Sequence, residues 1–203
     1  ATFYSSARKL WLFYLFFTLL EAVLLSIGGM GIFDAICHSF TTMATGGFST
    51  KQDSIAYWNS PYIQYVIIVF MCIAATNFGL FYAALKGDVK KLLLDEEFRW
   101  YMILILGATT IIATGLYWAN WGEEEKCIRD ALFQVVSIMT TTGFATADYL
   151  YWPTLLGLIL FILMFIGSCA SSTAGGIKVI RVVLLFKNSF TEMKRIIHPN
   201  AVI

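Results

Sequence analysis

The sequence predicts an all-α membrane protein in which one unit, made of a span, a half-helix, a polar loop and a second span, occurs twice. Of the 203 residues, 59% are hydrophobic and only 13% are charged, whereas about 25% of a typical soluble domain is charged. Long apolar runs fill much of the chain, and a short polar sequence between them is repeated. Together these features indicate a chain that uses the bilayer as its solvent.

Four stretches are long and apolar enough to cross a hydrocarbon core of about 30 Å, which needs about 20 helical residues. They are Leu10–Gly28, Tyr62–Leu85, Trp100–Trp118 and Pro153–Phe186. The last is too long for one plain helix and carries a polar interruption. It is therefore expected to differ from the other three.

The basic residues predict the orientation of these spans. Most of them precede the first span, separate the second from the third, or lie in and after the second half of the fourth: Arg8, Lys9, Lys86, Lys90, Lys91, Arg99, Lys178, Arg181, Lys187, Lys194 and Arg195. Only Lys51, Lys126 and Arg129 lie in the two other connections. By the positive-inside rule, the termini and the 86–99 loop are cytoplasmic, and both repeated loops face outside.

Two further apolar segments are too short to cross the membrane. Phe33–Ala44 and Cys127–Thr140 are each about three helical turns long, as expected of half-helices that re-enter the membrane from one side. Asp34 and Asp130 are expected near their N-termini, where a carboxylate favours the helix dipole and can cap free N–H groups.

Each half-helix leads into the same polar loop, because Met43–Thr50 returns without a gap as Met139–Thr146. A half-helix that enters from outside aims the negative end of its dipole at the membrane centre, where the free carbonyl oxygens of the following loop can replace an ion's hydration shell. Glycine allows the positive φ that aligned carbonyls require, and Phe48 and Phe144 are expected to wedge the loops against helices. The predicted cation-binding residues are Thr45, Gly46, Gly47, Thr141, Thr142 and Gly143.

The polar interruption of the fourth span is Gly167–Gly176, a run of small residues. Such a run either lets a neighbouring helix approach closely or breaks the helix, with glycines as hinges. The matching part of the second span, Ala74–Gly79, is much less interrupted. Lys178 follows the run and is expected either to repel cations or to extend its ammonium to the cytoplasmic interface.

Other polar residues have competing interpretations. Glu21 lies inside the first span and either faces an ion pathway or pairs structurally with another group. Cys37, Cys72, Cys127 and Cys169 lack metal-site spacing and are predicted to be small packing residues. No catalytic triad, phosphate-binding loop or histidine metal motif indicates an enzyme. A secondary cation transporter with a broken-helix site is the alternative, although its repeats would have opposite topology.

The chain resembles the Trk/Ktr/HKT potassium transporter family along essentially its whole length. The residues that carry the resemblance are His38-Ser39-Phe40, Gly46–Thr50, Phe133–Ser137, Thr142–Phe144, Gly167–Ala170, Gly175–Arg181 and His198–Ala201. The resemblance implies a pseudo-fourfold, potassium-channel-like pore of four units, each supplying one filter strand with a key glycine. Residues 1–86 resemble the second unit, and residues 87–203, with the broken last helix, resemble the third. We therefore expect an internal fragment; a half-size protein that dimerises is the alternative.

The resemblance also implies a function. It is potassium uptake across the bacterial inner membrane through a carbonyl-lined filter, with K⁺ as the transported ion at the filter residues and no cofactor in this chain. The expected partners are membrane lipid, the remaining repeats, a second copy in a homodimer and a TrkA-like cytosolic nucleotide-binding subunit, but not nucleic acid. Selectivity for K⁺ over Na⁺, and a channel as against a symport mechanism, stay open. The implied gate is the small-residue segment with Gly167, Ser168, Ser171, Ser172, Thr173, Gly175, Gly176 and Lys178.

Overall fold

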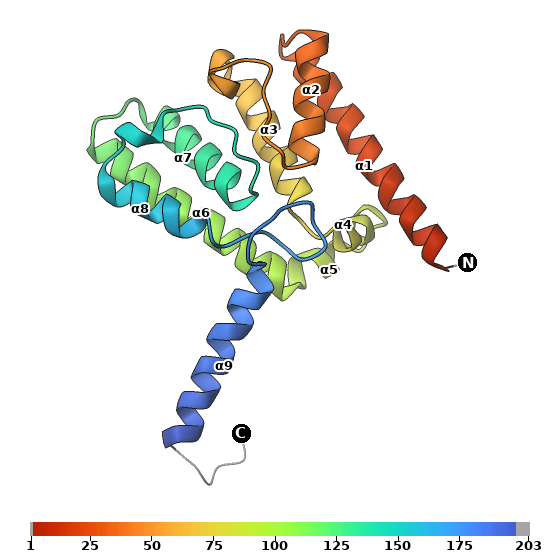
Figure 1. Cartoon of the computed structure of the whole chain (residues 1–203), viewed down its shortest axis with the longest axis vertical. Helices are drawn as coiled ribbons and strands as arrows, with labels where there is room; N and C mark the ends of the chain where they lie inside the picture. Colours follow the sequence, from red (N-terminus) through yellow and green to blue (C-terminus); the bar gives the residue numbers. More distant parts are fainter. Residues whose placement is uncertain (1, 198–203) are drawn as a thin grey trace.

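The computed structural model describes residues 2–197, and this part of the chain is helical without a β-strand. The prediction of an all-α membrane protein is confirmed. Figure 1 shows the arrangement of the elements. In chain order they are α1 (Thr2–Ile27), α2 (Ile32–Met43), η1 (Ser54–Tyr57), α3 (Pro61–Ala74), α4 (Phe78–Leu85), α5 (Val89–Leu94), α6 (Glu96–Trp118), α7 (Glu124–Met139), η2 (Tyr149–Tyr151), α8 (Thr154–Leu163) and α9 (Val179–Ile197).

Two of the predicted spans are single helices of membrane-crossing length. The apolar part of α1, Leu10–Ile27, matches the prediction, and α6 contains the predicted span within Glu96–Trp118. Helix α6 starts earlier than predicted because Asp95 caps it, with its carboxylate accepting the Phe98 N–H at 2.9 Å. Capping of this kind fixes where a helix can begin.

The predicted second span, Tyr62–Leu85, is wrong as a single helix. Helices α3 and α4 are separated by a short break and bend by 108°. Asn77 restarts the chain in the new direction, because its side-chain oxygen accepts the N–H groups of Gly79 and Leu80 at 2.9 and 3.4 Å. The stretch predicted to be less interrupted is thus a sharp corner.

The fourth predicted span, Pro153–Phe186, is broken. Helix α8 covers ten residues, α9 begins at Val179, and the intervening segment is not helical. We call residues 164–178 the intramembrane loop. Of the two interpretations of the small-residue run, the broken helix is therefore the one that the structure has.

Both half-helices are present as α2 and α7, but the expected caps are wrong. Asp34 lies in the first turn of α2 without capping it, and Gly31 is the residue at the N-cap. Asp130 is buried within α7, which begins at Glu124 because Glu124 and Glu125 supply the acidic first turn instead. Acidic residues in a first turn stabilise the helix dipole, so α7 extends outward beyond the predicted Cys127.

The core lies where the long spans pack on the half-helices. Helix α1 packs on α2, α6 packs on α7, and α3 lies against both α2 and α7. Tyr101 and Ile105 of α6 and Phe133 of α7 are almost completely buried there. All four cysteines are free thiols; Cys127 and Cys169 are buried, as expected of packing residues. The half-helices are thus held at fixed positions between the spans.

Gly115 tests the contact between α6 and α8. A Cβ atom at this position would lie 2.8 Å from a terminal carbon of buried Leu156, whereas a Cβ at Gly107 on the same helix would meet no atom within 4 Å. Overpacking typically costs about 1–3 kcal/mol. Gly115→Val should therefore lower the melting temperature of the intact protein in detergent by several degrees, whereas Gly107→Val should not. Equal melting temperatures for the two variants would contradict the packing described.

Candidate functional site

The two polar loops that follow α2 and α7 have the same backbone conformation. Thr45 and Gly47 have φ values of 50° and 65°, and their counterparts Thr141 and Gly143 have 56° and 85°. Positive φ is unusual for threonine, so its occurrence at both copies is a structural repeat as well as a sequence repeat. We call residues 45–48 and 141–144 the first and second polar loops.

Each polar loop is anchored to the last turn of its own half-helix. The Thr41 carbonyl accepts the N–H groups of Gly46 and Gly47 at 2.8 and 3.4 Å, and the Ser137 carbonyl accepts those of Thr142 and Gly143 at 3.0 and 3.2 Å. The hydroxyls act in the opposite sense: Thr41 donates to the Phe48 carbonyl at 2.9 Å, and Ser137 to the Phe144 carbonyl at 2.6 Å.

The carbonyl oxygens inside these loops are left free by this arrangement. Within residues 2–197, no hydrogen bond uses the carbonyls of residues 45–47 or 141–143. Buried or membrane-embedded carbonyls are normally paired. Unpaired oxygens in two equivalent loops are the kind of group that coordinates a dehydrated cation.

The first and second polar loops approach each other closely. A Cβ atom on Gly47 would overlap the Thr142 carbonyl, so only glycine permits this approach. Farther out, the Ala56 N–H donates to the Ala145 carbonyl at 3.1 Å. Phe144 is 1% exposed, with its ring centroid 5.8 Å from that of His38, whereas Phe48 is 77% exposed in this chain. The expected wedge is therefore present for Phe144 but not for Phe48.

Equivalent positions in the half-helices support the outer part of each loop by different chemistry. His38 contacts the Ser49 hydroxyl at 2.9 Å through Nε2, and its Nδ1 lies 2.6 Å from the Asp34 carbonyl oxygen. In the second copy, Gln134 donates to the Ala147 carbonyl at 3.1 Å. The two loops are thus alike in backbone but not in their support.

The intramembrane loop lies against the inner side of both polar loops. The Thr45 hydroxyl donates to the Thr173 carbonyl at 3.1 Å, and the Gly175 N–H donates to the Thr141 hydroxyl at 2.7 Å. Ser168 is fully buried and donates to the Met139 carbonyl at 2.9 Å. Figure 1 shows this blue segment below the ends of α2 and α7. A single segment therefore contacts both copies of the repeat.

The corner between α3 and α4 supplies further partners for the intramembrane loop. The Ala75 carbonyl accepts the Cys169 N–H at 3.1 Å, and the Ala74 carbonyl accepts the Thr173 hydroxyl at 3.1 Å. Both carbonyls are freed by the end of α3. The two breaks in helical structure thus satisfy each other's backbone groups.

Internal contacts shape the intramembrane loop itself. The Gly167 N–H donates to the Ile177 carbonyl at 2.8 Å, and a Cβ on Gly167 would overlap the Gly175 carbonyl. Gly176 has a φ of 73°. The Lys178 ammonium donates to the Ala174 carbonyl at the end of the loop. The remaining serines are Ser171, with a φ of 56°, and Ser172, whose hydroxyl donates to the Cys169 carbonyl at 2.6 Å.

The threonine hydroxyls expected at the cation site are already occupied by protein partners. Besides the contacts of Thr45 and Thr141 with the intramembrane loop, the Thr142 hydroxyl lies 2.7 Å from that of Thr140 in a buried position. These hydroxyls hold the loops in place. The oxygens of the polar loops that accept no hydrogen bond within residues 2–197 are main-chain carbonyl oxygens.

Glu97, for which the sequence predicted no role, also contacts the intramembrane loop. It is 7% exposed, and one carboxylate oxygen accepts the Ala170 N–H at 2.6 Å. The signal for it lies in helical periodicity: Glu97 is one turn before buried Tyr101, which is followed at the same spacing by buried Ile105. Its acidic neighbours Asp95 and Glu96 obscured that pattern.

Glu21 is completely buried, and neither of its carboxylate oxygens has a hydrogen-bond partner among residues 2–197. The structural pairing considered for it is therefore not seen in this part of the chain. No group of three or more acidic, histidine or cysteine side chains in the described residues could hold a metal ion. The candidate cation site remains the set of unpaired carbonyl oxygens in the two polar loops.

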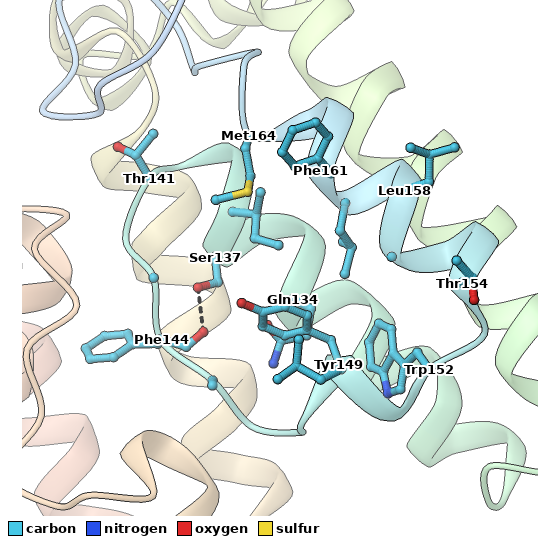
Figure 2. Close-up of a pocket in the computed structure, with 16 residues that line it drawn as sticks. Gln134, Ser137, Thr141, Phe144, Tyr149, Trp152, Thr154, Leu158, Phe161 and Met164 are labelled. Carbon is cyan, nitrogen blue, oxygen red and sulfur yellow. Dashed lines mark hydrogen bonds between the residues drawn. The ribbon is translucent and has the colours of Figure 1, made fainter.

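A pocket of about 790 Å³ lies beside the second polar loop, between α7 and α8. In Figure 2, Phe161 of α8 and Met164, the residue after α8, form one wall, while the Phe144 ring points away from them. Gln134, the counterpart of His38, also lines it. Beside Gln134, the second copy therefore has an open, mostly apolar pocket. Beside the equivalent residue of the first copy, His38, lies the ring of Phe144.

Comparisons with known proteins agree with this architecture. The family described as TrkH, cation transport protein, matches residues 3–203. The Trk system potassium uptake protein TrkH of Escherichia coli (strain K12) is 44% identical over 200 residues, which are 98% of this chain and 41% of that protein. TrkG of the same strain is 34% identical over 98% of this chain and 41% of its own length.

A solved structure is similar in three dimensions. The crystal structure of the potassium transporter TrkH from Vibrio parahaemolyticus superimposes with a TM-score of 0.93 and 40% identity. The match covers 98% of this chain and 43% of that one. The chain therefore spans less than half the length of these relatives.

The glycines of the polar loops should differ in their tolerance of a methyl group. Gly47→Ala combines positive φ with overlap at the Thr142 carbonyl, Gly143→Ala has positive φ alone, and Gly46→Ala has neither. Placing a non-glycine residue in the left-handed region costs about 1–2 kcal/mol. The melting temperature of the intact protein should fall most for Gly47→Ala and least for Gly46→Ala. The reverse order would refute the described approach of the two loops.

Proposed function

Because the chain belongs to the TrkH family of cation transport proteins, we propose that it forms part of a potassium uptake pore. Its proposed ion-binding residues are Thr45, Gly46, Gly47, Thr141, Thr142 and Gly143, and their main-chain oxygens replace the hydration shell of K⁺. K⁺ is the transported ion, and its net flux is directed inward across the bacterial inner membrane. The names of the E. coli relatives, which describe potassium uptake, support this proposal.

The observation that carries the proposal is the pair of equivalent loops with unused carbonyls. Each loop follows a half-helix whose C-terminal end points toward it, and the negative end of the helix dipole favours a cation there. Two loops cannot surround an ion, so two further loops from the remaining repeats would complete the ring. Residues 1–86 and 87–203 act in this proposal as two of four units.

The intramembrane loop is the proposed gate. Its hydrogen bonds to Thr45 and Thr141 hold it directly against both polar loops, where it obstructs the path of an ion. Thr173, Gly175 and Gly176 are exposed in this chain, and glycine gives the segment freedom to rearrange. Opening would move these residues away from the filter. The ammonium of Lys178 stays with the Ala174 carbonyl and moves with the loop.

The same proposal includes an orientation in the membrane and two protein partners. The two polar loops face the outside, whereas the termini and the 86–99 loop face the cytoplasm, in agreement with the positive-inside rule. The complete protein forms a homodimer in the membrane. A cytosolic nucleotide-binding subunit of the TrkA kind contacts its cytoplasmic face and controls the gate.

The filter assignment predicts a change in ion selectivity. In cells that lack potassium uptake, the intact wild-type protein should restore Rb⁺ uptake, whereas Gly143→Ser and Gly47→Ser should reduce it at least about tenfold, because a strain of about 1.4 kcal/mol corresponds to tenfold. The surviving uptake in Gly143→Ser should discriminate less between K⁺ and Na⁺. Gly107→Ser on α6 is the matched control. Unchanged K⁺/Na⁺ discrimination in both filter variants would exclude these loops as the filter.

The gate assignment predicts a leak. Ser168→Ala with Thr173→Val removes two hydroxyls that bond to the Met139 and Ala74 carbonyls, and each such bond contributes about 1 kcal/mol. The double variant should raise basal Rb⁺ flux by about tenfold, with discrimination against Na⁺ retained. Thr110→Val removes a hydroxyl that bonds only within α6 and is the control. Wild-type flux at normal expression would reject the gate.

A further inference from the structure

Glu97 occupies a position at which a charged side chain needs a specific reason. It lies in the first turn of α6 and is 7% exposed, although its neighbour Glu96 is exposed and pairs with Lys187 of α9. Acidic side chains are almost never buried unless they are paired. The partner of Glu97 is the backbone N–H of Ala170 at 2.6 Å.

This hydrogen bond joins the first turn of α6 to the intramembrane loop. Ala170 lies in the intramembrane loop between Cys169, bonded to the Ala75 carbonyl, and Thr173, bonded to the Ala74 carbonyl. The α3 corner thus supplies acceptors on one side of the loop, and α6 supplies a carboxylate on the other. A carboxylate that accepts an N–H forms a bond roughly twice as strong as a neutral one.

A positively charged side chain, that of Lys178, holds a second point of the intramembrane loop, closer to its C-terminal end. Lys178 donates its ammonium to the Ala174 carbonyl, so a carboxylate holds an N–H near the middle of the loop and an ammonium holds a carbonyl closer to its end. Both side chains are at least half-buried. The free N–H groups at the start of α6 also favour a carboxylate at Glu97.

We propose that Glu97 is a positioning residue that holds the intramembrane loop in its obstructing position through the Ala170 N–H. Glu97 does not contact the transported ion; it acts through the loop. Loss of the carboxylate releases the segment around Cys169 and Ala170, which lowers the barrier to ion passage. The flux part of this inference rests on the proposed potassium uptake, whereas the loop part does not.

The test uses native Cys169 as a reporter, because this thiol is 1% exposed and adjacent to Ala170. In the intact protein with every cysteine other than Cys169 replaced by serine, Cys37, Cys72 and Cys127 among them, a charged methanethiosulfonate reagent is applied to inside-out vesicles. Glu97→Met matches glutamate in length but lacks the acceptor, and should raise the labelling rate of Cys169 about tenfold, the effect of losing a charge-assisted hydrogen bond. Glu97→Gln keeps an acceptor and should give a smaller increase.

Two controls separate positioning from general destabilisation. Glu96→Met removes the neighbouring carboxylate and its pair with Lys187, and should leave Cys169 labelling at the wild-type rate. Rb⁺ uptake by Glu97→Met should show a higher maximal rate, while the KM for external Rb⁺, which the filter sets, should stay within about twofold of wild type. Glu97→Gln should recover most of the wild-type behaviour.

Each outcome decides a separate point. Labelling at the wild-type rate in a monodisperse Glu97→Met protein would overturn the proposal, as would a changed KM without faster labelling. If Glu97→Met is not folded, the proposal stands or falls on Glu97→Gln, whose labelling must exceed that of wild type and of Glu96→Met. If the wild type itself fails to take up Rb⁺ but Glu97→Met exposes Cys169, the proposed uptake is wrong and the positioning role holds.

Discussion

The structure depends on one constraint: at membrane depth, backbone outside a helix is tolerated only where it is buried in protein or lines a water-filled cavity. The corner after Ala74 and the intramembrane loop meet this constraint together, because carbonyls freed at the end of α3 accept N–H groups of the loop. The threonine hydroxyls of the polar loops bond the same segment. Neither break would be stable alone, so the irregular parts of the two units form one connected assembly.

The same constraint makes the free carbonyls of the polar loops informative. Parts of the irregular backbone are held by paired groups, as at the Gly167 N–H and the Ile177 carbonyl. The carbonyls of residues 45–47 and 141–143 are unpaired in two equivalent loops, at positions fixed by the Thr41 and Ser137 carbonyls. Unpaired carbonyls at equivalent positions of two repeated loops support the proposed cation site, because carbonyl oxygens can replace the hydration shell of a cation.

Much of this could be predicted from the sequence, and the remainder could not for physical reasons. Spans such as Trp100–Trp118 and the repeated loops follow from hydropathy and from similar local sequence, which depend on neighbouring residues alone. The bend at Ala75–Asn77 depends on carbonyls that accept hydrogen bonds from a segment about a hundred residues later in the chain, so its local sequence looks nearly continuous. Glu97 was missed for the same reason: its partner, Ala170, is distant in sequence.

The two units show how a duplicated pore element can keep its backbone and change its surroundings. At the position of His38 the second copy has Gln134, so a titratable ring that bonds Ser49 is replaced by a neutral amide that bonds the Ala147 carbonyl. The carbonyl geometry is nearly the same in both copies, but the groups behind it differ in charge and stiffness. In the proposed function, the two polar loops thus present similar main-chain oxygens with different side chains behind them. The feature that the two loops share, and on which the proposed ion binding rests, is the backbone with its positive φ values and unpaired carbonyls.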